Sequence, residues 1–162
     1  MCSMFGDLRL KILRSFRTPI LVFYRNFPGP LISTQYLVYG NESRLILAKT
    51  AILQNALFNV MSGKIIVEDY VFFGHNVSIL TGTHDYHKTG SERQKAVPSS
   101  GRDIIIKKGV WIASNATILG PCVIGENSVI GPCCLIDKDV PPSTVCTSGT
   151  TVEFKKIKNL DS

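Results

Sequence analysis

Charge is scarce in this chain of 162 residues, since only 19% of them are charged while 44% are hydrophobic. A chain with this balance can bury an apolar core, which excludes an intrinsically disordered protein. Acidic residues are the scarcer kind, with 12 against 18 basic ones. The positive excess gathers in residues 1–27, and the stretch beyond them is nearly neutral. We therefore expect one domain without a nucleic-acid partner.

Long hydrophobic runs are also missing. The longest apolar run near the N-terminus spans residues 19–24, far fewer than the ~20 residues that a membrane-spanning helix requires. No apolar stretch with a cleavage site indicates a secretory signal. The five cysteines are an odd number and show no disulfide framework. We therefore expect a reduced protein located in the cytoplasm.

Regular repetition is what the sequence has instead. An isoleucine recurs at every sixth position from Ile106 to Ile136. A period of six does not fit one face of a helix, which turns by ~100° per residue. It fits short strands, because each isoleucine is preceded, two positions earlier, by another inward residue. These residues are Val110, Ala116, Cys122, Ser128 and Cys134.

Turn-forming residues separate these short strands. Three positions after successive isoleucines come Gly109, Asn115, Pro121, Asn127 and Cys133. Glycine and asparagine tolerate a positive φ, and proline suits a turn better than a strand interior. Each group of six is therefore predicted to form one flat side of a coil. Stacked coils of this kind form an all-β solenoid, in which each coil buries its apolar edge against its neighbours.

The repeat is interrupted once by a long insertion. It starts irregularly at Leu45, with Leu57 and Asn59 as expected inward residues, and its phase slips by two residues near Ser62. After Ile79 the next isoleucine in phase is Ile106, 27 residues later instead of six. About 21 residues are therefore expected to leave the coil as a loop, and such insertions commonly carry function.

Two of the three histidines lie where this loop begins, in the segment TGTHDYH of residues 81–87. A neutral imidazole can accept a proton from a hydroxyl group near pH 7. The alternative is that His84 and His87 are merely solvated loop residues. Because the loop interrupts a strict repeat, we favour a catalytic role for one of them.

The ends of the chain differ from the repeat. Residues 5–17 mix apolar and basic side chains in a pattern that predicts a short amphipathic helix. We expect residues 1–40 to form a basic helical cap over the strand edge of the first coil. The alternative is a weak peripheral contact with an anionic membrane. The solenoid domain is expected over residues 41–157, with the loop at 80–105, followed by a tail at 158–162.

The repeat, the loop with THDYH and the run KKGVWIASNATILGPCVIGENSVIGPCCLIDKDVPPSTV resemble the hexapeptide-repeat acyltransferases. Within them the chain is most similar to galactoside and maltose O-acetyltransferases and to acetyltransferases that modify polysaccharide sugars. The resemblance covers roughly residues 45–157. It implies a left-handed parallel β-helix of triangular cross-section and a homotrimer with active sites between subunits. It also implies acetyl transfer from acetyl-CoA to a hydroxyl of a sugar or glycan precursor, with no metal required.

The resemblance also implies roles for single residues. His84 matches the catalytic histidine, a general base that deprotonates the acceptor hydroxyl for direct attack on the thioester. Trp111, one position before an inward isoleucine, is expected to point outward, as a subunit contact, a cofactor wall or a plain surface residue. The other acetyl-CoA candidates are Ser114, Pro132, Lys138 and Lys156, with Lys155 as the alternative to Lys156. The acceptor-binding candidates are Asn59, Ser62, Asp85, Tyr86, His87 and Arg102.

Three alternative functions remain open. An N-acetyltransferase acting on an amino sugar would use the same scaffold and would also need a base. A zinc hydratase resembling the γ-type carbonic anhydrases would need three histidine ligands, and only His75, His84 and His87 are available. A non-catalytic solenoid serving as an interaction module would not need His84 in a complete loop.

Overall fold

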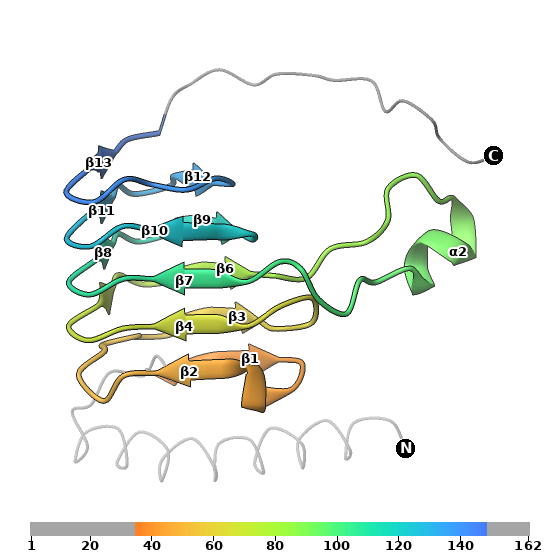
Figure 1. Ribbon diagram of the computed structural model, residues 1–162, viewed down its shortest axis with the longest axis horizontal. Coiled ribbons are helices and arrows are strands. Elements are labelled where there is room, and N and C mark those ends of the chain that lie inside the picture. Colours follow the sequence, from red (N-terminus) through yellow and green to blue (C-terminus); the bar gives the residue numbers. More distant parts are fainter. Residues whose placement is uncertain (1–34, 149–162) are drawn as a thin grey trace, which may run out of the picture. The chain divides into compact units, whose positions relative to one another are not determined.

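The computed structural model describes residues 35–148, and its regular structure consists almost entirely of very short strands (Figure 1). Its helical segments are the 3-10 turn η1 (Glu42–Arg44) and the helix α2 (Gly90–Lys95). In this part of the chain no helix is long and apolar enough to cross a membrane. The strands are β1 (Leu37–Tyr39), β2 (Leu45–Leu47), β3 (Leu57–Asn59), β4 (Ile65–Val67), β5 (Phe72–Phe73), β6 (Ser78–Leu80), β7 (Ile104–Ile106), β8 (Trp111–Ile112), β9 (Thr117–Leu119), β10 (Cys122–Ile124), β11 (Val129–Ile130), β12 (Leu135–Ile136) and β13 (Val145–Cys146).

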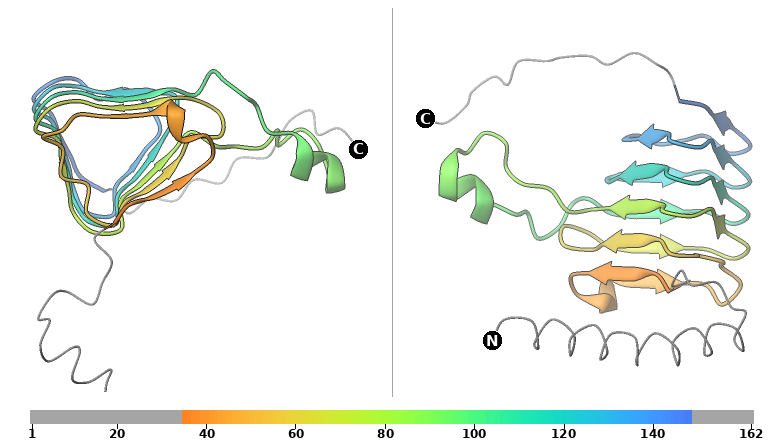
Figure 2. Two further views of the ribbon diagram at one scale, coloured as in Figure 1. Left: turned by 90° about the horizontal axis from the view of Figure 1, so that it is seen from below. Right: turned by 180° about the vertical axis from the view of Figure 1, so that it is seen from behind.

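The strands stack into three parallel sheets, which form the faces of a triangular coil (Figure 2). Face A has the strand order β1-β3-β6-β9-β12, face B has β2-β4-β7-β10, and face C has β5-β8-β11-β13. The chain visits the faces in the order A, B and C. It turns clockwise as it rises toward a viewer at the end that carries β13, so the coil is left-handed (Figure 1). The expected left-handed parallel β-helix is thus confirmed.

The isoleucine ladder lines the interior of this coil. The isoleucines of the ladder from Ile106 to Ile130 have no exposed surface, and Ile136 in the last coil is half-buried. The small residues between them are buried as well. Parallel pairing stacks equivalent residues from coil to coil, so that Ile118 lies between Ile79 and Ile136. Each coil therefore buries its apolar edge against its neighbours, as the repeat predicts.

The corner residues have the conformations that their types predict. The angle φ is +70° at Gly109, +61° at Asn115, +58° at Asn127 and +58° at Cys133. These values lie in the left-handed region, which glycine and asparagine enter most readily. At Pro121 the chain turns through a cis peptide bond instead. The predicted corners are therefore confirmed.

The lengths of the connections show which corner of the triangle is variable. All five connections from face B to face C have four residues, at 48–51, 68–71, 107–110, 125–128 and 141–144. Those from face C to face A have three residues in the first coil (54–56) and four afterwards. The corner between faces A and B instead has the segments 40–44, 60–64, 81–103 and 120–121. All additional residues of these coils therefore leave at this one corner.

The second coil corrects one expectation about the inward residues. Phe58 is fully buried and points inward, whereas Leu57 is exposed and Asn59 is half-buried. The reason is the connection before β3, which turns at Gln54 and is one residue short. The β-helix also starts before the expected boundary at residue 41, because β1 (Leu37–Tyr39) already pairs with β3. Most of the predicted N-terminal cap and the whole C-terminal tail lie outside the described residues.

The predicted loop leaves the coil after β6, carries α2, and returns at β7 (Figures 1 and 2). Its two ends meet at a narrow neck. The Nε of Arg102 donates to the carbonyl of Thr81 at 2.8 Å, and the backbone N–H of Arg102 donates to the carbonyl of Ser62. A methyl group on either Gly63 or Gly120 would collide with the backbone of Arg102. Glycine at both positions therefore lets the neck fit between neighbouring coils.

The central position of Ile118 predicts a large loss of stability on truncation. Replacing Ile118 by alanine should lower the free energy of unfolding by about 2–5 kcal/mol, because it leaves a cavity between two coils. The matched control is Thr117→Ala on the outer side of the same strand, which should cost less than about 1 kcal/mol. Urea unfolding followed by circular dichroism measures both. Equal losses in the two variants would contradict the interior packing described above.

Candidate active site

A cavity of about 270 Å³ lies where the loop meets the irregular corner between faces A and B. The loop contributes His84, and the neighbouring strand β3 contributes Asn59. Apart from the imidazole of His84, the side chains that line the cavity are apolar or are polar without a charge. They belong to Tyr39, Asn59, Met61, Thr83, His84, Gln94 and Val97, with Gly82 adding backbone.

The imidazole of His84 has a defined orientation. Its Nδ1 lies 2.9 Å from the carbonyl oxygen of Arg93, at the end of α2. A carbonyl oxygen only accepts hydrogen bonds, so Nδ1 must carry the proton. In the neutral ring Nε2 is then the acceptor. The ring is exposed, so this nitrogen is placed to take a proton from a bound hydroxyl.

Asn59 is fixed beside the segment that leads to His84. Its Oδ1 accepts from the backbone N–H of Met61 at 3.0 Å. Gly82 packs so closely on the Asn59 amide that a methyl group there would lie 2.5 Å from the amide nitrogen. The Nδ2 group remains as a donor for a ligand in the cavity. Among the predicted acceptor-binding residues, Asn59 is the one that the structure places in the cavity with His84.

Two other predicted acceptor-binding residues build the loop neck instead. Ser62 is fully buried, and its hydroxyl has no hydrogen-bond partner among the described residues. Its backbone N–H donates to the hydroxyl of Thr81. Arg102 directs its Nε to the Thr81 carbonyl, away from the residues that line the cavity. Ser62 and Arg102 therefore do not line the cavity within one chain, and both hold the loop where it leaves the coil.

The remaining predicted acceptor-binding residues follow His84 directly. The carboxylate of Asp85 accepts from the backbone N–H of His87 at 3.0 Å, and the Asp85 N–H donates to Ala96. The rings of Tyr86 and His87 lie 4.4 Å apart between centroids. Tyr86 is 57% exposed. None of these three predicted residues lines the cavity, so Asp85 shapes the loop while Tyr86 lies on its surface.

The predicted acetyl-CoA residues lie on other parts of the coil. Trp111 is on face C, Ser114 and Pro132 are at the corner between faces C and A, and Lys138 follows β12. Lys155 and Lys156 lie outside the described residues. Within one chain, Trp111, Ser114, Pro132 and Lys138 are not among the residues that line the cavity with His84.

Trp111 points outward, as its position before an inward isoleucine predicts. It is 43% exposed and stacks on Phe72 of the preceding coil, with ring centroids 5.7 Å apart and ring planes 11° from parallel. Ile52 and Val145 continue this column along face C, and both are exposed. Face C therefore presents a column of apolar side chains to the outside of the coil.

The sequence reasoning missed several residues around His84. Gln94 and Val97 line the cavity, and Arg93 holds the imidazole, yet none of the three was a predicted site residue. A signal for α2 was present, because Thr89 is followed three residues later by Glu92, the spacing of a capping box. Tyr39 and Met61 carried no comparable signal, since they lie in the irregular first coils.

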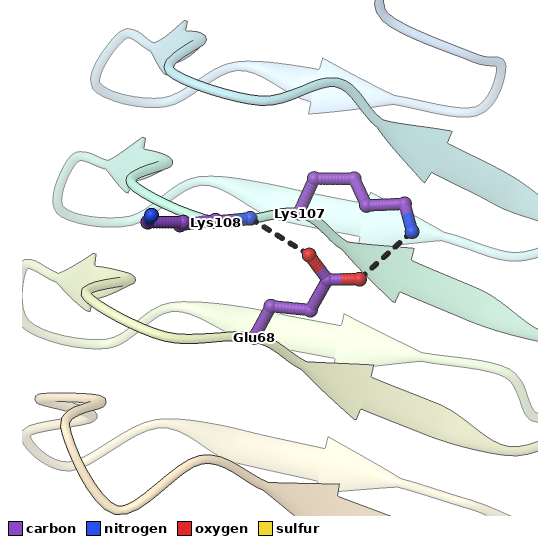
Figure 3. A network of polar contacts seen from close by, with 3 residues as sticks. All are labelled: Glu68, Lys107 and Lys108. Atoms are coloured by element: carbon purple, nitrogen blue, oxygen red, sulfur yellow. Dashed lines mark hydrogen bonds and ion pairs between the residues drawn. The ribbon is translucent and has the colours of Figure 1, made fainter.

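A larger groove of about 520 Å³ on face B includes two carboxylates that hold neighbouring coils together. The carboxylate of Glu68 accepts from Nζ of Lys107 at 2.8 Å and from the backbone N–H of Lys108 at 3.1 Å (Figure 3). The carboxylate of Asp139 accepts from the backbone N–H of Val123 at 2.7 Å. These bonds join successive coils, so we assign them to the fold.

The histidines do not form a metal site. His75 lies at the corner between faces C and A, whereas His84 follows face A on the way to face B. Within residues 35–148, no three histidine, cysteine, aspartate or glutamate side chains gather in a way that could hold a metal ion. This placement gives the zinc-hydratase alternative no support.

Cys122 is a buried inward residue near the loop neck, and its ionisation predicts how stability depends on pH. Burial, and to a smaller extent the carboxylates of Asp139 and Asp137, raise the pKa of its thiol from 9.0 to about 11, while Arg102 acts in the opposite direction. The folded state therefore favours the neutral thiol. This contribution to stability is complete below pH 9 and is lost as the pH rises through about 11.

Urea unfolding between about pH 8 and pH 11 tests this dependence, with Cys122→Ala as the comparison. The parent protein should lose more stability across that range than the variant, which has no thiol at this position. Parallel curves for the two proteins would show that Cys122 does not titrate with a raised pKa.

The repeats define the class of the protein. Residues 103–138 match the family described as "Bacterial transferase hexapeptide (six repeats)". These residues form β7 to β12 together with their corners. Residues 103–138 thus carry transferase hexapeptide repeats, and the resemblance stated from the sequence is confirmed.

Particular proteins show the same resemblance. A galactoside O-acetyltransferase of Lactococcus lactis subsp. lactis (strain IL1403) is 30% identical over 143 residues, which cover 86% of this chain and 59% of that protein. A galactoside O-acetyltransferase of Escherichia coli (strain K12) is 34% identical over 100 residues, covering 59% and 49%. The crystal structure of a maltose O-acetyltransferase from Clostridium difficile 630 has a TM-score of 0.48 and 26% identity, covering 78% of this chain and 69% of that chain. The chain therefore spans about half to three-fifths of the length of the two galactoside O-acetyltransferases.

Proposed function

We propose that this protein is an acetyl-CoA-dependent O-acetyltransferase that acts on a hydroxyl of a sugar or glycan precursor. The observation that carries the proposal is the geometry of His84, whose Nδ1 is held by a carbonyl so that Nε2 is a proton acceptor beside a cavity. The similarity to galactoside O-acetyltransferases supports acetyl-CoA as the donor and a sugar hydroxyl as the acceptor.

In the proposed reaction His84 acts as the general base. Its Nε2 takes the proton of the acceptor hydroxyl while the hydroxyl oxygen attacks the carbonyl carbon of the acetyl thioester. The tetrahedral intermediate then collapses, the carbon–sulfur bond breaks, and the proton held by His84 passes to the leaving sulfur. The products are an acetyl ester and free coenzyme A. The Arg93 carbonyl keeps the ring in the required tautomer and stabilises the transient imidazolium.

The lining of the cavity favours an uncharged acceptor. Among the described residues that line the cavity, none carries a carboxylate that could pair with an ammonium group, and none is a lysine or arginine that could pair with a phosphate. Asn59 and Gln94 can exchange hydrogen bonds with hydroxyl groups, and Tyr39 offers an apolar surface to the C–H face of a sugar ring. Hydroxyl acetylation is therefore favoured over N-acetylation of an amino sugar.

Acetyl-CoA binding is proposed to involve two subunits. Trp111, Ser114 and Pro132 lie on face C or at its edge, away from the cavity of their own chain. In a homotrimer with sites between subunits, these residues and Lys138 of one chain would face the His84 of another. The apolar column of face C gives such an assembly a contact surface.

The proposed location is the cytoplasm, because the free cysteines of the described part suit a reducing compartment.

Replacing His84 by alanine should lower kcat for acetyl transfer by a factor of about 10² to 10⁴, since the general base is removed. Release of the coenzyme A thiol with methyl galactoside and maltose as acceptors measures the rate. The control is Lys95→Ala, an exposed residue of the same loop outside the cavity lining, which should keep the parent rate. Turnover at the parent rate by a folded His84→Ala protein would rule out this mechanism.

Replacing Trp111 by alanine should raise the KM for acetyl-CoA by about 3- to 10-fold, because an aromatic contact of about 0.5–1.5 kcal/mol is lost. Trp111→Phe should recover most of the affinity. Steady-state kinetics gives the KM, and analytical ultracentrifugation gives the oligomeric state. If alanine changed neither quantity, Trp111 would be a plain surface residue.

A further inference from the structure

Arg93 joins two segments of the loop that carries His84. Its Nε donates to the carbonyl oxygen of Lys88 at 2.5 Å, and its Nη2 donates to the carbonyl oxygen of Tyr86 at 2.9 Å. Its own carbonyl oxygen accepts from Nδ1 of His84 at 2.9 Å. The side chain of Arg93 therefore holds the segment that follows His84, and its main chain holds the imidazole.

Packing contributes little to the position of this part of the loop. None of the residues of α2 is buried, and a helix of six residues is not stable in isolation. A backbone hydrogen bond from Asp85 to Ala96 adds one more link between the two segments. In a segment with so little packing, the two hydrogen bonds from the charged guanidinium are strong restraints, because hydrogen bonds to charged groups are stronger than those between neutral groups.

We propose that the guanidinium of Arg93 is the positioning group for His84. It fixes α2 against the segment from Tyr86 to Lys88, and this contact places the Arg93 carbonyl that holds the imidazole. Without the guanidinium, α2 and its carbonyl move relative to His84. The ring then loses both its orientation and its Nδ1-protonated tautomer. The predicted loss of catalysis rests on the function proposed above, whereas the predicted change in the imidazole does not.

The geometry requires arginine at this position. The two carbonyl groups are reached by two different nitrogens of one planar group, Nε and Nη2. A lysine carries its donors on one nitrogen atom at the end of a flexible chain and cannot reproduce this fork. Arg93→Lys should therefore resemble Arg93→Ala more than the parent protein, although it keeps the charge.

The test compares Arg93→Ala and Arg93→Lys in the full chain, with Lys95→Ala as the matched control. Lys95 is an exposed cation on the same helix, outside the residues that line the cavity. With methyl galactoside or maltose as acceptor, both Arg93 variants should lose about 10- to 100-fold in kcat, the scale expected for a displaced catalytic group. Their KM for acetyl-CoA should change less than about twofold, because Arg93 does not touch the donor. Lys95→Ala should match the parent protein.

Nitrogen-15 NMR of labelled histidine provides a readout that does not need turnover. In the parent protein the His84 signals should show protonated Nδ1 and unprotonated Nε2 near pH 8, and in the Arg93 variants this tautomer should be depleted. The thermal unfolding midpoint should stay unchanged, because α2 buries no side chain. An unchanged tautomer in Arg93→Ala, or a full kcat in that variant, would overturn the positioning role. If the parent protein transferred no acetyl group, the proposed function would fail, while the NMR comparison would still decide the role of Arg93.

Discussion

The equal perimeter of the coils is the constraint on which the whole structure depends. Parallel strands of two or three residues stay paired only if each coil returns the chain to a position directly above its start. The interior then stacks Ile118 between Ile79 and Ile136. A corner that kept extra residues in the wall would shift the register and expose inward side chains. Additional residues must therefore leave the coil, and the corner between faces A and B is where they do so.

This corner explains where the cavity forms. Three successive coils lengthen there, through residues 40–44, 60–64 and 81–103. Met61 comes from the second insertion, and His84 comes from the third, while Tyr39 ends the strand before the first. Stacked regular coils leave flat faces with paired backbones, whereas insertions at neighbouring levels create a concave surface. The rigid coil thus supplies fixed positions, and the irregular corner supplies the side chains that can differ between relatives with the same repeat.

The sequence predicted the parts of the structure that depend on periodicity. The ladder from Ile106 to Ile136 identified the interior, the corner residues and the outward direction of Trp111, because each of these follows from counting along a regular coil. It failed at Leu57, since one missing residue near Gln54 reverses inside and outside in a strand. The loop was found from the gap in the repeat, the two histidines at its start from their chemistry, and His84 among them from the resemblance to the hexapeptide-repeat acyltransferases. Its neighbours in the cavity depend on contacts between different coils, which no periodicity encodes.

The arrangement around His84 shows how a loop outside the core can still hold a base accurately. A loop that buries few side chains has little packing to restrain it, so its geometry depends on hydrogen bonds to the backbone. At the neck, Arg102 binds the carbonyl of Thr81, and at the far end Arg93 binds the carbonyls of Tyr86 and Lys88. Both guanidinium groups donate hydrogen bonds to backbone carbonyls, and neither of the two arginines lines the cavity. In the proposed reaction, recognition of the acceptor is left to neutral groups such as Asn59 and Gln94, and the imidazole of His84 moves the proton.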